Sequence, residues 1–160
     1  VFYFGSKYSE KGLISFDYEI SFLESVYQYY ASLADVKLIY YIPHRDDSPK
    51  KVKEIEKLGF IIREYEQTAE VAMIEESIHP ARIGSAYSTI LSTLPLLLPK
   101  IIFESFVIPL DCIPEQYRKG VRSAYEYYES HGISLLDYKE GRFVGRIRAD
   151  KSVGSVHSTS

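Results

Sequence analysis

Cysteine is almost missing from this sequence, since Cys112 is the only one among 160 residues. A single cysteine excludes an intrachain disulfide and a zinc site built on cysteine pairs. Basic residues are also in the minority, with 19 Lys and Arg against 22 Asp and Glu and a formal net charge of −3. Nucleic-acid binding demands a basic surface, so we expect no nucleic-acid partner.

Long apolar runs are missing as well. A bilayer-spanning helix needs ~18–20 apolar residues, and the longest run here, around residues 90–98, is interrupted by Ser92, Thr93 and Pro95. The first residues carry neither a basic leader nor the cleavage pattern of a signal peptide. Together with the single cysteine, these absences favour a cytoplasmic location.

What the chain does contain is a regular alternation of apolar segments, within a composition that is 46% hydrophobic and sufficient for a buried core. The expected strands are residues 1–4, 36–42, 60–65, 82–86, 100–107 and 133–138, and the expected helices are residues 17–33, 50–58, 68–77, 88–94 and 115–130. Strands that alternate with helices at this spacing are joined by right-handed crossovers. The pattern predicts an α/β fold with a Rossmann-like, doubly wound, largely parallel sheet.

The domain organisation follows from the same pattern. Residues 1–140 form one expected nucleotide-binding domain without an internal linker, whereas residues 141–160 turn polar and basic and are expected to be a loosely ordered tail. Because the chain starts directly on a strand, we expect it to be the C-terminal domain of a longer protein.

Ligands of open α/β sheets bind beyond the carboxyl ends of the strands, so the residues that follow each strand are candidates. Gly5 and Ser6 follow the first strand, where a glycine lets the backbone approach a ligand, although a tight turn explains it equally well. His44 follows the second strand and the stiff Pro43. A histidine there can donate to a phosphate oxygen, and the alternative is a solvated loop histidine paired with a neighbouring carboxylate.

Two further candidates lie at expected helix starts. Glu70 lies in the first turn of the helix capped by Thr68, where a carboxylate can accept from a ribose hydroxyl or simply complement the helix dipole. Ser88 and Thr89 begin the next helix, where hydroxyls and free N–H groups form an anion site. Serine is also a common helix cap, so this signal has a structural alternative.

Several common site patterns are absent. The sequence contains neither a glycine-rich dinucleotide fingerprint nor a Walker phosphate loop, and no Ser-His-Asp arrangement follows from its spacing. Asp46 and Asp47 are adjacent loop carboxylates without a third ligand, so we expect them to be solvent-exposed and expect no metal site. His79 precedes a strand and is expected to be structural or exposed.

The candidate residues lie in segments that resemble a known family. Residues 40–45 (YYIPHR), 69–71 (AEV) and 83–89 (IGSAYST) resemble motifs in the donor-binding, C-terminal half of bacterial lipooligosaccharide sialyltransferases, glycosyltransferase family 52, and of related sialyl- and polysialyltransferases with a two-domain GT-B fold. Arg45 stands where the family often has proline. The resemblance covers about residues 1–138 and is strongest over residues 39–95.

The resemblance implies CMP-sialic acid as the donor and an inverting, metal-independent transfer to a glycan hydroxyl of lipooligosaccharide or capsular polysaccharide, with no further cofactor. It implies that His44 stabilises the leaving phosphate or acts as general acid. Ser88 and Thr89 would contact the phosphate, and Glu70 the ribose or base. The remaining residues expected at the donor site are Gly5, Ser6, Thr68, Gly84 and Ser85.

The family's general base belongs to an acidic motif in the N-terminal acceptor domain, and this chain lacks that motif. We therefore expect this chain alone to bind the nucleotide but to transfer little or no sugar. The implied partners are the nucleotide sugar, the glycan acceptor and the missing N-terminal domain. Homodimers occur in the family, and peripheral attachment of the full-length protein to the cytoplasmic membrane stays open.

Two other hypotheses remain open from the sequence. The chain can be the donor half of another GT-B glycosyltransferase that uses a UDP- or GDP-sugar. Alternatively, it is a non-catalytic α/β interaction domain, with a partner surface formed by Asp46, Asp47 and the tyrosine-rich first helix.

Overall fold

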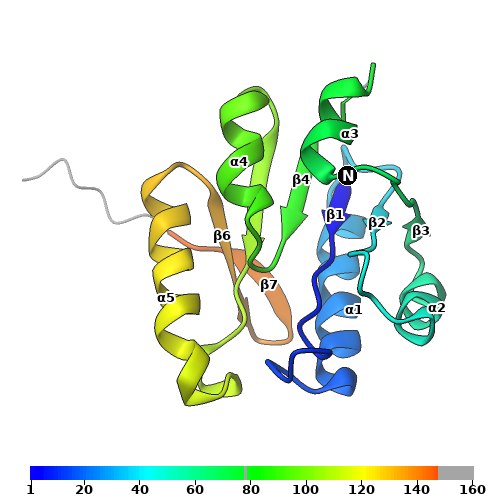
Figure 1. The fold of residues 1–160 in the computed structure, drawn as a ribbon. Coiled ribbons are helices and arrows are strands. Elements are labelled where there is room, and N and C mark those ends of the chain that lie inside the picture. Colours follow the sequence, from blue (N-terminus) through cyan, green and yellow to red (C-terminus); the bar gives the residue numbers. More distant parts are fainter. Residues whose placement is uncertain (78, 148–160) are drawn as a thin grey trace, which may run out of the picture.

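The computed structural model describes residues 1–77 and 79–147, which form one sheet covered by helices on both faces (Figure 1). The seven strands lie in the order β3-β2-β1-β4-β5-β6-β7. All neighbours pair in parallel except β6 and β7, which are antiparallel. The strands are β1 (Phe2–Phe4), β2 (Tyr40–Ile42), β3 (Ile61–Ile62), β4 (Arg82–Ser85), β5 (Ile102–Phe106), β6 (Ser134–Lys139) and β7 (Arg142–Gly145). This arrangement confirms the predicted Rossmann-like α/β fold.

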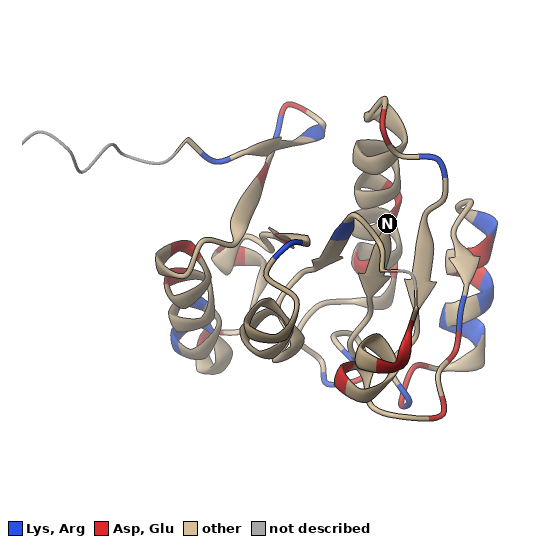
Figure 2. Cartoon of the chain, turned by 90° about the horizontal axis from the view of Figure 1, so that it is seen from above, with Lys and Arg blue, Asp and Glu red and all other residues tan. Residues whose placement is uncertain are grey.

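The helices divide between the two faces of the sheet. They are α1 (Phe16–Ser32), α2 (Pro49–Lys57), α3 (Ala69–Glu75), α4 (Ile90–Leu97) and α5 (Glu115–Ser130), with a short 3₁₀ turn η1 (Leu110–Cys112) before α5. Helix α1 packs against α2 and β7 behind the sheet, whereas α3 packs against α4 in front of it (Figure 1). Figure 2 shows basic and acidic residues alternating along α2, while α4 carries none. No helix in the described part of the chain is long and apolar enough to cross a membrane.

The core beneath α1 is built largely from aromatic rings. Phe106 on β5 is fully buried and lies 5.9 Å from Tyr3, 5.3 Å from Tyr30 and 5.0 Å from Phe143, measured between ring centroids. Edge-to-face contacts of this kind add to the large apolar area that each ring buries. Tyr3 and Tyr30 therefore help to pack α1 onto the sheet.

The structure differs from the expected element boundaries at both edges of the sheet. β2 and β3 are shorter than the apolar runs around them, and α4 continues through Pro95 to Leu97. β7 lies inside the segment expected to be a loosely ordered tail, because Phe143 is buried against α1 and residues 142–145 pair with β6. The remainder of that segment, from residue 148 on, lies outside the described residues.

Candidate functional site

The candidate site lies where the sheet reverses its strand order. From β1 the chain proceeds outward to β2 and β3, and it then crosses back to β4 on the other side of β1. The loops that follow β2, β1 and β4 are therefore neighbours at the carboxyl edge, and they carry His44, Gly5 and Ser88, respectively. Ligands of open α/β sheets bind at this kind of switch point.

The loop after β2 forms a tight turn that orients His44. The Asp47 N–H donates to the His44 carbonyl at 2.8 Å, and the His44 N–H donates to Asp47 Oδ2 at 3.1 Å. The imidazole Nδ1 accepts from the Asp46 N–H at 3.1 Å, so the neutral ring carries its proton on Nε2. The His44 side chain is 33% exposed. A hydrogen bond from Lys7 at 2.7 Å lowers the pKa of Asp46.

Gly5 lies directly under the side chain of Tyr41. A Cβ atom at position 5 would overlap the Tyr41 hydroxyl and would lie 3.0 Å from Asp47 Oδ2. The Gly5 N–H donates to the Ile42 carbonyl at 3.0 Å, which continues the parallel ladder past the end of β1. Protein side chains therefore occupy the space that this glycine leaves. The next carbonyl, that of Ser6, accepts from Lys51 Nζ at 2.8 Å.

Behind this turn lies a buried charge cluster that the sequence analysis missed. Lys51 Nζ has no exposed surface and contacts Glu19 Oε1 at 2.6 Å, Asp47 Oδ1 at 2.9 Å and Glu10 Oε2 at 3.3 Å. The second oxygen of Glu19 accepts from the Ser9 N–H at 3.1 Å. The four charged side chains come from the β1–α1 loop, α1, the β2–α2 loop and α2, so the cluster ties these elements together.

The expectation that Asp46 and Asp47 are both solvent-exposed is wrong for Asp47. The side chain of Asp46 is 45% exposed, but that of Asp47 is fully buried by Tyr41 and Lys51. A sequence signal was available, because Asp47 and Lys51 stand four residues apart across the Ser48 cap of α2. Residues at this spacing face one another at a helix start.

The cluster shifts the pKa values of its members. Burial alone opposes the charged form of Lys51, but Glu19 and Asp47 outweigh it and raise the pKa of the ammonium above its usual value. Burial raises the pKa of Glu19, and the attraction of Lys51 offsets this only in part. The ammonium of Lys51 is therefore held firmly in its charged form.

Tyr8 closes the gap between the loops of β1 and β4. Its ring stacks on Tyr87 with centroids 5.8 Å apart. Its hydroxyl donates to the Tyr87 carbonyl at 2.6 Å and accepts from the Tyr87 N–H at 2.9 Å. No local signal in the sequence predicts that the loop after β1 contacts the loop after β4. Tyr8 thus holds the backbone of Tyr87, the residue that precedes Ser88.

Ser88 and Thr89 come directly before α4 rather than inside it. The hydroxyl of Tyr128 on α5 accepts from the Ser88 N–H at 3.0 Å and donates to the Ser88 carbonyl at 2.7 Å. The Ser88 N–H is therefore not free for an anion, contrary to the expected anion site. The Ser88 hydroxyl accepts only a long bond of 3.4 Å from the Ile90 N–H, and Thr89, the N-cap of α4, makes no side-chain capping bond. The Ser88 and Thr89 hydroxyls are thus the polar groups that remain available to bind a ligand at this loop.

Four of the expected donor-site residues do not join the His44 and Ser88 loops. Gly84 and Ser85 lie within β4, where a Cβ on Gly84 would overlap the Tyr30 hydroxyl and the buried Ser85 Oγ donates to the Phe4 carbonyl at 2.8 Å. Glu70 accepts from Thr93 Oγ1 of α4 at 2.8 Å, and this bond joins α3 to α4. Thr68 is the N-cap of α3 but makes no side-chain capping bond.

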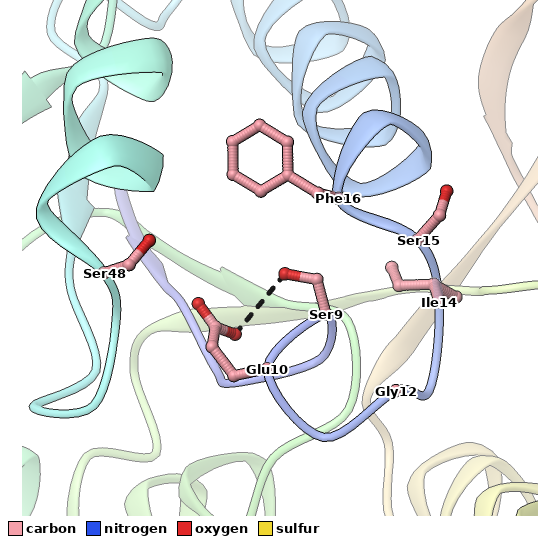
Figure 3. A pocket seen from close by; sticks show the side chains of 7 residues that line it. All are labelled: Ser9, Glu10, Gly12, Ile14, Ser15, Phe16 and Ser48. Carbon is pink, nitrogen blue, oxygen red and sulfur yellow. Dashed lines mark hydrogen bonds between the residues drawn. The ribbon is translucent and has the colours of Figure 1, made fainter.

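A surface hollow of about 550 Å³ adjoins the buried cluster. Figure 3 shows its lining, which consists of Ser9, Glu10, Gly12, Ile14, Ser15, Phe16 and Ser48. Two of these serines are occupied as helix caps, because Ser15 Oγ accepts from the Tyr18 N–H and Ser48 Oγ accepts from the Lys51 N–H. The hollow therefore offers few free polar groups of its own. Across residues 1–77 and 79–147 no group of His, Cys, Asp and Glu side chains is arranged to hold a metal ion.

The class of this protein is that of Rossmann-like α/β domains whose loops meet at a central switch point. No protein-family model matches the chain, and no curated protein matches it either.

Proposed function

We propose that this chain is the donor-binding domain of a GT-B sialyltransferase and that it holds CMP-sialic acid at the His44 and Ser88 loops. One observation carries the proposal: the loops after β2 and β4, which bear the family-like motifs, flank the switch point of the sheet on either side of β1. Residues 44 positions apart in sequence thereby come to one edge of the fold. The proposal locates the protein in the cytoplasm or at the inner face of the membrane.

The hydrogen bonds of His44 support this role. Its Nδ1 accepts from the Asp46 N–H, which leaves the proton on Nε2 for donation to a phosphate oxygen. In the proposed transfer the acceptor hydroxyl attacks the anomeric carbon, the bond to the CMP phosphate oxygen breaks, and negative charge develops on that oxygen. A donor aimed at this oxygen stabilises the leaving group.

Ser88 and Thr89 supply the second set of donors. Tyr128 holds the backbone of Ser88 through two hydrogen bonds, so the hydroxyl is carried on a fixed backbone. Hydroxyl donors whose backbone is held in place lose little entropy on binding an anion. Glu70 is bonded to Thr93 and does not join these loops, so it has no role in this proposal.

The acceptor hydroxyl must lose its proton to a base, which the family carries on its N-terminal domain. We therefore propose that this chain binds CMP but transfers little or no sialic acid alone. Robust transfer to a lipooligosaccharide acceptor by the isolated chain would contradict this part of the proposal.

The test is a calorimetric titration of the chain with CMP, with UMP, UDP and GDP as competitors. We expect selective CMP binding, weakened by about ten- to a hundredfold in His44→Ala because a charge-assisted hydrogen bond is lost. His131→Ala, at the C-cap of α5, is the matched control and should bind CMP normally. Preference for UDP or GDP would indicate another GT-B donor, and no binding at millimolar nucleotide would indicate an interaction domain.

A further inference from the structure

One ammonium group joins the loop that carries His44 to the neighbouring loop after β1. Lys51 Nζ donates to the Ser6 carbonyl in the loop after β1 at 2.8 Å and to Asp47 Oδ1 in the loop after β2 at 2.9 Å. It also pairs with Glu19 of α1 at 2.6 Å. The Lys51 side chain has no exposed surface, so these contacts are shielded from bulk solvent.

Asp47 connects Lys51 to His44, because one of its carboxylate oxygens binds Lys51 and the other binds His44. Its Oδ1 is held by Lys51, while its Oδ2 accepts from the Tyr41 hydroxyl at 2.8 Å and from the His44 N–H at 3.1 Å. The Asp47 N–H returns a bond to the His44 carbonyl at 2.8 Å. His44 and Asp47 are thus joined by two hydrogen bonds across the turn, and the Asp47 carboxylate is also bound to Lys51.

Stabilisation of the fold alone does not explain why this cluster is charged. A buried ion pair loses most of its Coulomb energy to desolvation, and a well-packed apolar replacement is often as stable. Here three carboxylates surround one ammonium, although an apolar side chain could fill the same space between α1 and α2. What an apolar side chain cannot do is donate to the Ser6 carbonyl and the Asp47 carboxylate at the same time.

We propose that Lys51 is a positioning residue that sets the conformation of the His44 turn through Asp47. The identity of the ligand in this inference rests on the proposed function, whereas the effect of Lys51 on the conformation of the turn does not. The inference predicts that removing the ammonium loosens residues 44–47 selectively and weakens CMP binding through His44 alone.

The first measurement is amide hydrogen exchange on wild type and Lys51→Met, without nucleotide. We expect the protection of the His44, Asp46 and Asp47 amides to fall by about tenfold or more, because their hydrogen bonds depend on the turn. Amides of β5 and α5 should keep their protection. Lys57→Met is the matched control, since Lys57 lies on the same helix with its side chain 70% exposed.

The second measurement is a double-mutant cycle on CMP affinity with His44→Ala and Lys51→Met. Lys51→Met should weaken CMP binding by about tenfold in the wild-type background, which corresponds to ~1.4 kcal/mol. It should have little effect in the His44→Ala background. Equal losses in both backgrounds would overturn the proposal, as would unchanged or uniformly reduced amide protection.

The two measurements separate this inference from the proposed function. If wild type binds no CMP but Lys51→Met still loosens residues 44–47 selectively, the proposed function fails and the positioning role stands. If Lys51→Met does not fold, Asp47→Asn serves in both measurements, since it keeps the shape of the side chain but cannot satisfy Lys51, Tyr41 and His44 together. Unaltered protection of the turn in folded Asp47→Asn would overturn the proposal.

Discussion

Gly5 and the hydroxyl of Tyr41 occupy adjoining space, so that a Cβ atom on residue 5 would overlap the phenol oxygen. The same hydroxyl donates to Asp47 at 2.8 Å. A contact between a backbone position after β1 and a side chain of β2 thus supports the turn that carries His44. The glycine predicted here as a close approach to a ligand is, in the structure, a close approach to the protein's own tyrosine.

Gly5→Ala should therefore destabilise the fold by about 1–3 kcal/mol, because the added methyl group forces Tyr41 and Asp47 to move in a packed site. The measurement is urea unfolding followed by circular dichroism. Gly120→Ala is the matched control. No atom lies within 4 Å of a Cβ at that position in α5, so alanine should stabilise the helix by up to ~1 kcal/mol. Equal effects of the two substitutions would contradict the contact described above.

Tyr8→Phe should destabilise the protein by about 1–3 kcal/mol. The substitution keeps the ring that stacks on Tyr87 but leaves the Tyr87 N–H and carbonyl without their partner. Tyr117→Phe, at an exposed position of α5, serves as the control and should be nearly neutral. Thermal unfolding of the three proteins measures the difference. A neutral Tyr8→Phe would mean that water satisfies the Tyr87 backbone.

Ser85→Ala and Ser88→Ala should have opposite effects on stability and binding. The Ser85 hydroxyl is buried and donates to the Phe4 carbonyl, so its loss should cost about 0.5–1.5 kcal/mol of stability and leave CMP affinity unchanged. Ser88 is the residue of the pair placed at the proposed site, so its loss should weaken CMP binding by several-fold with little change in stability. Calorimetric titration and urea unfolding of both variants test this. A larger loss of CMP affinity in Ser85→Ala would place the ligand elsewhere.

Glu104→Gln should remove part of the pH dependence of stability. Burial raises the pKa of Glu104, and Arg82 at 3.2 Å offsets this only in part. A carboxyl group whose folded pKa is raised contributes stability below its unfolded value near 4.5, and it loses that contribution as the pH rises through the folded pKa.

The Gln variant does not titrate at position 104. The free energy of unfolding of the variant, relative to that of wild type, should therefore increase as the pH rises from 4 to 7. Urea unfolding across this range gives the difference directly. Because Glu19 is present in both proteins, its own raised pKa cancels from the comparison. A stability difference that stays constant with pH would show that Arg82 and Tyr29 fully compensate the burial of Glu104.

The sequence predicted that His44 follows a strand and that Gly84 and Ser85 lie within the strand expected at residues 82–86, and the structure agrees with both. Pro43 ends an apolar run, and this local signal locates the carboxyl end of β2. No local signal shows whether small residues such as Gly84 and Ser85 make room for a ligand or for the protein's own side chains. The structure places both inside β4, where they accommodate Tyr30 and bond to β1.

The alternation of strands and helices can be predicted from the sequence alone, and with it the parallel sheet and the residues that follow its strands. These features depend on local periodicity and on breakers such as Pro43 and Gly59. The contact of Glu19 with the buried Lys51 and the contact of Tyr8 with Tyr87 follow from the tertiary structure alone. Both depend on contacts between segments far apart in sequence, and the path of a loop is set by what its side chains can pack against and bond to.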